Sequence, residues 1–284
     1  MSGRRVVVRG LRRPRSTPIR RVSARLTPAR AAALLGLLLS AASIYGVSAS
    51  SAFSLREIEI EPLHYTDPTA IRSSLAIREG SNLFALRAET LVAPLLRMSA
   101  VAEARVEIGL PDRVIVRIEE RQPILVWQVG PQKFLVDRRG VLFATVASLP
   151  AEAVAELPVV TDRRIASEAA LGETDSVEAI VLDAATRLAS VRPGDIGSAA
   201  TSLAVEVGDE SGFVIRAEPL GWLAIFGFYT PTLRTTEMIP GQVRLLRSLL
   251  ADREATVARV VLADDTSGTY LPKPTARPSP TSRR

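Results

Sequence analysis

A strongly basic segment is followed by 23 residues without a charged side chain near the start of this chain. Residues 31–53, AAALLGLLLSAASIYGVSASSAF, contain no Asp, Glu, Lys or Arg. At about 1.5 Å per residue, a helix of this length spans roughly 34 Å, enough to cross a hydrocarbon core about 30 Å thick. The sequence therefore predicts a single transmembrane helix over residues 31–53.

The segment before this helix is a basic tail. Residues 1–30 contain ten arginines and no acidic residue, and subtracting these ten from the formal charge of +6 leaves −4 for the rest of the chain. Because such a segment cannot bury enough apolar surface to fold alone, we expect residues 1–30 to be disordered. Arginines beside a membrane span are retained in the cytoplasm, which predicts a cytoplasmic N-terminus and an extracytoplasmic position for everything after residue 53.

Two alternatives for this region remain open. A cleaved secretory signal peptide is one, because Val47-Ser48-Ala49 resembles a cleavage site. The basic region is far longer than the usual start of a signal peptide, which favours an uncleaved anchor. Nucleic-acid binding is the other, but no aromatic residue lies between the arginines to stack on bases. We expect the tail to contact anionic lipid headgroups and no nucleic acid.

Few residues in this chain suit catalysis or metal binding. There is no Cys and only one His, His64, so thiolate metal sites, Cys nucleophiles and His clusters for zinc are excluded. Glu119 and Glu120 are adjacent in a predicted strand and point to opposite faces, so they cannot converge on one substrate. Asp264-Asp265 precede Thr-Ser-Gly, a pattern typical of a turn. We predict no catalytic residue, cofactor, metal ion or small-molecule substrate.

Residues 54–123 show the pattern of a small α+β domain. Ile and Glu alternate in the first segment, as in a half-buried strand, and Asp67-Pro68 is typical of a helix start. A Gly-Leu-Pro-Asp turn then joins two alternating segments, which predicts an antiparallel hairpin with both helices on one face of the sheet. The expected strands are 55–61, 101–108 and 113–120, and the expected helices are 68–75 and 88–97.

Residues 124–270 predict a second, β-rich domain with helices on one side. The aromatic residues at positions 222, 226, 228 and 229 are expected in its core, because large aromatic side chains dominate core burial. Residues 271–284 are rich in Pro and Ser and are expected to be disordered. The expected strands are 124–129, 134–136, 141–144, 202–207, 212–217, 222–228 and 255–263, and the expected helices are 176–189 and 242–251.

The order and spacing of these features resemble the FtsQ/DivIB family of bacterial cell-division proteins, in which a POTRA domain follows a single membrane anchor. One position departs from the family: Gln242 stands where a Lys is usual at the start of the last helix, unless that basic position has moved to Arg244. The residues that carry the resemblance are Phe53, Ile58 to Ile60, Glu79 to Phe84, Val101, Ala104 to Val106, Leu110-Pro111, Glu119 to Pro123, Trp127, Leu135 to Asp137 and Gly140 to Phe143.

The resemblance implies a non-enzymatic scaffold at the division septum. Its POTRA domain would help to recruit it, and its β domain would hold the FtsL/FtsB coiled-coil pair and connect it to septal peptidoglycan synthesis. FtsK and FtsW/FtsI-like synthases are further partners that the resemblance implies. The last strand of the family and the segment after it carry the coiled-coil contact, and a sheet edge can pair with another chain's strand. By position, the partner-binding residues would be Val260, Leu262 and Tyr270.

Two other functions remain open. One is an extracytoplasmic hydrolase that uses a pair of carboxylates, since Asp and Glu are plentiful. Converging carboxylates in a pocket would support this function. The other is a POTRA-bearing chaperone for secreted polypeptides, which would also act by strand pairing.

Overall fold

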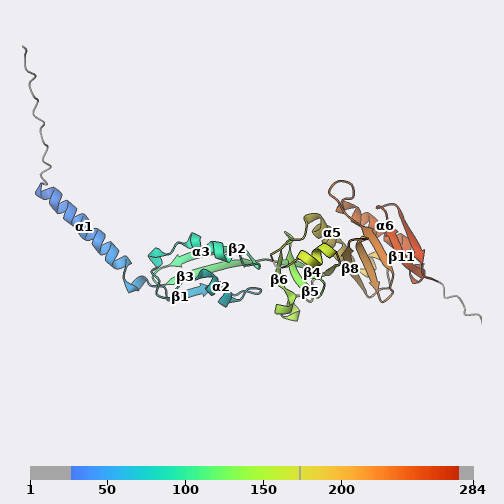
Figure 1. The fold of residues 1–284 in the computed structure, drawn as a ribbon, viewed down its shortest axis with the longest axis horizontal. Coiled ribbons are helices and arrows are strands. Elements are labelled where there is room, and N and C mark those ends of the chain that lie inside the picture. The colour runs from blue at the N-terminus through green and yellow to red at the C-terminus, as the bar shows by residue number, and fades with distance from the viewer. Residues whose placement is uncertain (1–26, 173, 275–284) are drawn as a thin grey trace, which may run out of the picture. The chain divides into compact units, whose positions relative to one another are not determined.

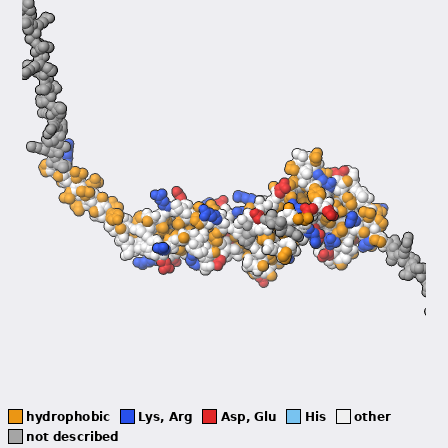
Figure 2. Space-filling view, in the orientation of Figure 1, with side chains coloured by type: hydrophobic (Ala, Val, Ile, Leu, Met, Phe, Trp, Pro, Cys, Tyr) orange, Lys and Arg blue, Asp and Glu red, His pale blue; other side chains and the backbone are white. Residues whose placement is uncertain are grey.

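The computed structural model describes residues 27–172 and 174–274, in two units that divide between Ala52 and Phe53. The first unit contains helix α1 (Pro28–Ser48), which starts with a proline and is exposed along its length. Helix α1 begins three residues before the expected start at residue 31 and ends five residues before the expected end at residue 53. Within the described residues it is the one helix long and apolar enough to cross a membrane, and its surface is almost wholly hydrophobic (Figure 2). Most of the predicted tail, residues 1–26, lies outside the described ranges.

The second unit begins with an α+β module in the predicted order (Figure 1). Its strands β1, β3 and β2 lie in that order, with β1 parallel to β3 and β2 antiparallel to it. Asp67 caps the first helix by accepting a hydrogen bond from the backbone N–H of Thr69 at 2.8 Å, as the Asp-Pro pair predicts. The elements are β1 (Glu57–Ile60), α2 (Pro68–Leu75), α3 (Ala88–Leu95), β2 (Val101–Gly109) and β3 (Arg113–Glu120).

Both helices of this module cover one face of its sheet and leave the other face charged. The covered face is apolar because alternate strand residues point towards the helices. The hairpin, the helix start and the helices on one face are therefore as predicted. The buried residues shared by helices and sheet include Ile71, Leu75, Leu91, Leu95, Val106, Val114 and Val116.

A sheet of nine strands follows in the described residues, in the order β12-β11-β10-β9-β8-β7-β4-β5-β6. Helices α5 (Ala179–Ala189) and α6 (Ile239–Leu250) contact each other and pack on the sheet, and α4 (Ile165–Ala170) follows β7. The strands are β4 (Pro123–Val129), β5 (Gln132–Asp137), β6 (Leu142–Thr145), β7 (Val159–Asp162), β8 (Ser202–Gly208), β9 (Gly212–Glu218), β10 (Leu223–Gly227), β11 (Val257–Leu262) and β12 (Gly268–Pro272).

The aromatic residues expected in the core are buried there, with one exception. Trp222 and Phe226 are fully buried and Tyr229 is 8% exposed, together with Trp127 on β4. Phe228 is half-exposed instead, because it follows β10 in a loop that leaves the sheet.

Two strands were not predicted. β7 lies in the middle of the sheet, parallel to both β4 and β8, although it has only four residues. β12 pairs antiparallel with β11 and continues to Pro272, so its last two residues lie in the segment that was expected to be a disordered tail. The rest of that predicted tail, residues 275–284, lies outside the described ranges. Neither segment shows a clear alternation of apolar and polar residues in the sequence, so pairing with neighbouring strands defines both of them.

The segment between the two sheets is held by charged side chains. The buried carboxylate of Glu120 accepts hydrogen bonds from the backbone N–H groups of His64 and Tyr65, at 2.7 and 2.9 Å. Arg121 donates to the carboxylate of Asp137 at 2.6 Å and to the carbonyl oxygen of Ser99 at 2.9 Å. Glu119 points to the exposed face, as the alternation predicts, so the Glu-Glu-Arg segment serves as a structural junction.

Candidate partner-binding edge

Strand β12 forms one edge of the nine-stranded sheet. All five of its residues are exposed, and β11 pairs with it on one side. Within residues 27–172 and 174–274, no strand pairs with its other side. An edge strand of this kind presents backbone N–H and C=O groups that another strand can bind.

Two hydrogen bonds at the ends of β12 show which of its backbone N–H and C=O groups point towards β11. The N–H of Lys273 donates to the carbonyl oxygen of Thr256 at 2.7 Å, and the carbonyl oxygen of Ser267 accepts from Ala263 at 2.9 Å. In an antiparallel pair, both groups of one residue point to the same side, and the side alternates along the strand. The odd-numbered residues of 267–273 therefore bond to β11, and the even-numbered ones point outward.

The outward groups are the N–H and C=O of Gly268 and Tyr270 and the C=O of Pro272. Proline has no N–H, so it fits an edge strand at a position where that group would face away from the sheet. Pro272 occupies such a position, which agrees with the alternation. The edge therefore offers two donors and three acceptors to a partner strand.

Helix α6 lies beside this edge. Gly268 is opposite Leu262 and Tyr270 is opposite Val260, so both share the face of the sheet that α6 covers. A Cβ atom on residue 268 would lie only 3.2 Å from side-chain carbons of Leu245 and Leu249 on α6, so glycine allows the helix to approach closely. These two leucines are half-buried and form an apolar flank next to the open edge.

Tyr270 is the partly exposed side chain at the centre of the edge. It is 37% exposed, and the guanidinium carbon of Arg253 lies 5.6 Å from the centre of its ring. This separation is in the range of a cation–π interaction. The interaction holds the Tyr270 side chain at the end of α6.

The structure brings the three predicted partner-binding residues together but gives them different environments. Val260 and Leu262 lie on β11 and are 0% and 2% exposed, under α6, whereas Tyr270 lies on the edge strand. The open edge is therefore one strand further along the chain than the sequence predicts. Gly268 was not predicted, because residues 268–272 show no hydrophobic period that would indicate a strand. A charged residue at Val260 or Leu262 would be buried and would disturb the fold, so tests of partner binding belong on β12.

The turn that precedes β12 is well ordered. The carboxylate of Asp264 accepts hydrogen bonds from the backbone N–H groups of Thr266 and Ser267, at 2.7 and 2.6 Å. The hydrogen bond from the Thr266 backbone is the main cause that lowers the pKa of Asp264. The Asp264-Asp265 pair thus forms a turn, as predicted.

An arginine anchors the same end of the sheet. The guanidinium group of Arg234 donates to the carbonyl oxygens of Leu262, at 2.7 Å, and of Phe226 and Ala263. These carbonyl groups end the parallel strands β10 and β11, so Arg234 joins the two strands next to the open edge.

At position 242, where the resemblance implies a lysine, this chain buries a neutral amide. Gln242 on α6 is fully buried; its side-chain oxygen accepts from the hydroxyl of Tyr229 at 2.7 Å, and its side-chain nitrogen donates to Phe226 at 3.3 Å. Burial raises the pKa of Tyr229, which keeps its hydroxyl a donor. Gln242 therefore stabilises the core under the edge.

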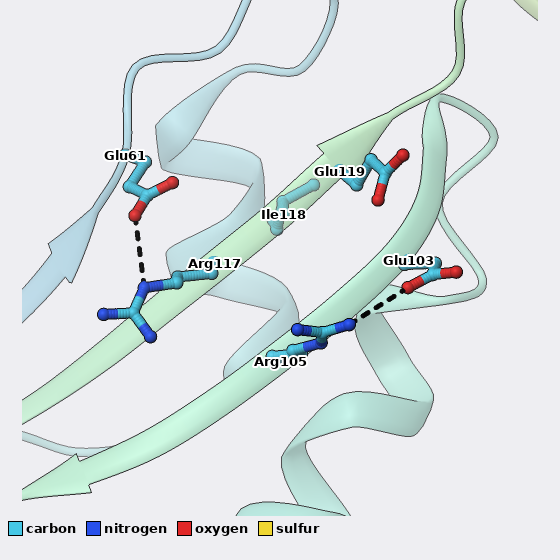
Figure 3. Close-up of a pocket in the computed structure, with 6 residues that line it drawn as sticks. All are labelled: Glu61, Glu103, Arg105, Arg117, Ile118 and Glu119. Carbon is cyan, nitrogen blue, oxygen red and sulfur yellow. Dashed lines mark hydrogen bonds and ion pairs between the residues drawn. The ribbon is translucent and has the colours of Figure 1, made fainter.

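The exposed face of the first sheet carries a shallow hollow of about 200 Å³ that contains three carboxylates (Figure 3). Arg117 contacts Glu61 at 3.2 Å, and Arg105 contacts Glu103 at 3.6 Å. Glu119 lies on the same face (Figure 3). The arginines pair with Glu61 and Glu103, whereas Glu119 lies opposite Glu103 in the register of β2 and β3 with no arginine between them. The hollow is shallow and open, unlike the concave pockets that usually bind a substrate. In the two described ranges, no group of three or more Asp, Glu or His side chains is placed to hold a metal ion.

Comparison with known proteins agrees with this architecture. Residues 53–121 match the family model "POTRA domain, FtsQ-type". The chain is 30% identical over 235 residues to the cell division protein FtsQ of Chloroflexus aurantiacus, an alignment that covers 82% of this chain and 75% of that protein. The chain belongs to the FtsQ family.

Other members of the FtsQ family match to different extents. The FtsQ protein of Chloroflexus aggregans is 28% identical over 236 residues, which cover 82% of this chain and 75% of that protein. The FtsQ protein of Rickettsia felis is 33% identical over 98 residues, 34% of this chain and 37% of its own. Membership of the FtsQ family, together with α1, identifies a membrane-anchored cell-division protein.

Proposed function

We propose that this FtsQ-family chain is a non-enzymatic scaffold of the division complex at the septum, and that it holds a partner through strand β12. It crosses the membrane once, with the arginine-rich segment in the cytoplasm and the residues after α1 outside it. The open edge of β12, with the outward backbone groups of Gly268 and Tyr270, is the observation that supports this function. The domain division is residues 54–123 for the POTRA domain and a β domain from residue 124 that includes β12.

Strand addition explains how the edge would bind. A partner strand bonds to the outward groups at positions 268, 270 and 272 and extends the sheet by one strand. Its side chains on the helix side then cover Leu245 and Leu249, which are half-buried in the chain alone. The backbone bonds supply affinity and the leucine flank selects apolar side chains at alternate positions.

The partner in this proposal is the FtsL/FtsB coiled-coil pair, by family resemblance. Capture of this pair connects the chain to FtsW/FtsI-like synthases and so to septal peptidoglycan synthesis. The POTRA domain supports recruitment to the division site, where FtsK is a further partner.

A pair of substitutions at one position tests the edge. Tyr270→Pro removes the outward N–H but leaves the bonds between β12 and β11, because residue 270 does not bond to β11. Tyr270→Ala keeps that N–H and removes the side chain. We expect the proline variant to bind the purified FtsL/FtsB pair about tenfold or more weakly, since it loses a hydrogen bond and places a ring in the path of the partner strand. We expect the alanine variant to retain most of the affinity.

The measurement is binding of the full-length chain in nanodiscs to the coiled-coil pair, with thermal unfolding as a check of folding. Full affinity in a folded Tyr270→Pro variant would rule out strand addition at β12. Equal losses in both variants would show that the Tyr270 ring, and not the backbone edge, makes the contact.

A further inference from the structure

Two loops of the first module meet next to the point where the chain enters it from α1. The loop at residues 80–86 is tied to Leu55, whose C=O accepts from Gly80 at 2.9 Å and whose N–H donates to Ser81 at 2.9 Å. The turn at residues 109–112 is tied to the next residue, because the N–H of Arg56 donates to the carbonyl oxygen of Asp112 at 2.8 Å. Both loops are therefore fixed to residues 55–56.

Each loop presents a large apolar side chain to solvent. Phe84 and Leu110 are both 54% exposed, and the ring of Phe84 packs edge-to-face on that of Phe53 with a centroid distance of 5.0 Å. Asn82 caps the short 3₁₀ helix η2 (Leu83–Ala85) by accepting from the N–H of Phe84 at 2.9 Å. This turn buries Leu83 and directs Phe84 outward, so the exposure of Phe84 is built into the loop.

Leu96 provides a contrast within the same module. It is 49% exposed and lies five residues before Val101, which pairs with Glu120 at the far end of β3. The turn with Leu110 lies beside Arg113, at the near end of that strand. Of the three exposed large apolar residues of the module, two thus lie at the end where the chain enters.

The length of the connection limits how far this end can be from the membrane. Only residues 49–52 separate the end of α1 from Phe53. Five steps of at most about 3.5 Å give a maximum reach of roughly 17 Å from Ser48. The 21 residues of α1 span about 32 Å, close to the thickness of the hydrocarbon core, so Ser48 falls near its boundary. The entry end of the module is therefore within reach of the lipid headgroups.

We propose that Phe84 and Leu110 contact the lipid surface and hold the first module against the bilayer. Aromatic side chains are favoured at the membrane–water interface, where an apolar ring leaves water. The neighbouring charges are mixed, with Arg56 beside Glu57 and Asp112, so the contact is apolar and depends little on ionic strength. This contact needs no partner protein and is separate from the β12 edge.

Fluorescent labels on single cysteines test the proposal, because the chain has no native Cys. F84C, L110C and the matched control L96C are each labelled with an environment-sensitive fluorophore in the full-length chain. The chain is placed in vesicles of phosphatidylethanolamine and phosphatidylglycerol that contain lipids with a nitroxide on the headgroup. We expect quenching and a blue-shifted emission at positions 84 and 110 but not at position 96, both at low and at high salt. Quenching at 84 and 110 no stronger than at 96 would overturn the proposal.

A second pair of variants keeps the native phenylalanine in place. Ala85 is exposed beside Phe84, so A85C reports on the loop without removing the ring. Adding F84S to A85C is expected to abolish most of the quenching, while thermal unfolding shifts only slightly, because Phe84 is half-exposed and loses the ring contact with Phe53. Quenching of A85C that persists with F84S would overturn the role of Phe84. Quenching that disappears in high salt would show attraction of charges in place of apolar contact.

Discussion

The two edges of the nine-stranded sheet differ in whether another segment of the chain forms hydrogen bonds to the edge strand. At the β6 edge, the segment 174–177 bonds to the strand: Leu142 donates to Asp175, and Thr174 donates back to Leu142, both at 2.9 Å. At the β12 edge, no segment within residues 27–172 and 174–274 makes such bonds. The chain closes one edge with its own backbone, so the open edge is not a general property of this sheet. Exposed edges promote pairing with other chains, and the proposed strand addition rests on this edge and its apolar flank.

The closed edge depends on one glycine. Gly140 has a φ of +85°, and a Cβ atom at this position would lie 2.5 Å from the carbonyl oxygen of Val177. The carbonyl oxygen of Gly140 also accepts a hydrogen bond from the N–H of Val177 at 2.9 Å. Only a residue without a side chain allows the covering segment to lie this close.

The largest loss of stability that we predict comes from displacing the segment that covers the β6 edge. Gly140→Ala should lower the free energy of unfolding by about 1–3 kcal/mol, because it adds backbone strain and displaces the covering segment. Urea unfolding measures the loss, and amide exchange of Leu142 should become faster. Gly130→Ala is the matched control, since Gly130 also has a positive φ (+53°) but nothing within 4 Å of the added carbon. Equal effects of both substitutions would mean that strain alone, and not the cover, stabilises this edge.

A smaller effect is expected at the open edge from loss of the cation–π contact. Arg253→Ala removes the guanidinium group 5.6 Å from the Tyr270 ring and should cost about 0.5–1 kcal/mol of unfolding free energy. Arg259→Ala, at an exposed arginine on β11, controls for the loss of one positive charge. If both variants unfold at the same urea concentration, the ring contact does not stabilise the edge.

The smallest predicted effect is that low pH destabilises the β12 edge relative to the β6 edge. The pKa of Asp264 is lowered by its hydrogen bonds in the folded chain, so its contribution is complete above the unfolded value of about 3.9. That contribution is lost as the pH falls through the lower, folded pKa. We expect the amides of Thr269 and Leu271, which bond to β11, to exchange faster relative to Leu142 below pH about 4.

Asp264→Asn distinguishes this cause from general acid unfolding. The amide oxygen of asparagine still accepts hydrogen bonds, but it does not gain a proton in this range. The ratio of exchange rates between the two edges should then change little with pH. A pH response in the Asn variant equal to that of the native chain would assign the effect to another group.

Elements that depend on neighbours in sequence were predicted well. The uncharged segment, the Asp67 helix start and the β2–β3 hairpin each rest on residues a few positions apart, and the structure contains all three. The buried positions of the first module follow from simple alternation. The role of Glu120 at the junction was predicted only in outline, because its partners His64 and Tyr65 lie 56 and 55 residues away.

Partner binding at the candidate edge stays a prediction, and the sequence located the strands of this edge only in part. Tyr270 was identified and is exposed, whereas Val260 and Leu262 were assigned to an edge that β12 in fact covers. β12 has five residues, begins with Gly and ends with Pro, so no hydrophobic period indicates a strand. β12 is a strand because it pairs with β11 and lies beside the leucines of α6.

The sequence alone determined the membrane anchor, the order of elements in the first module and the family, because each rests on composition or on local spacing. Within residues 27–172 and 174–274, the tertiary structure decided which edge of the large sheet another segment covers and which edge none covers. β4 pairs with β7 and β10 pairs with β11, in parallel, and each pair is joined through 29 intervening residues. Pairing over such distances depends on how whole helices and strands pack together, and a local pattern of residues does not specify it.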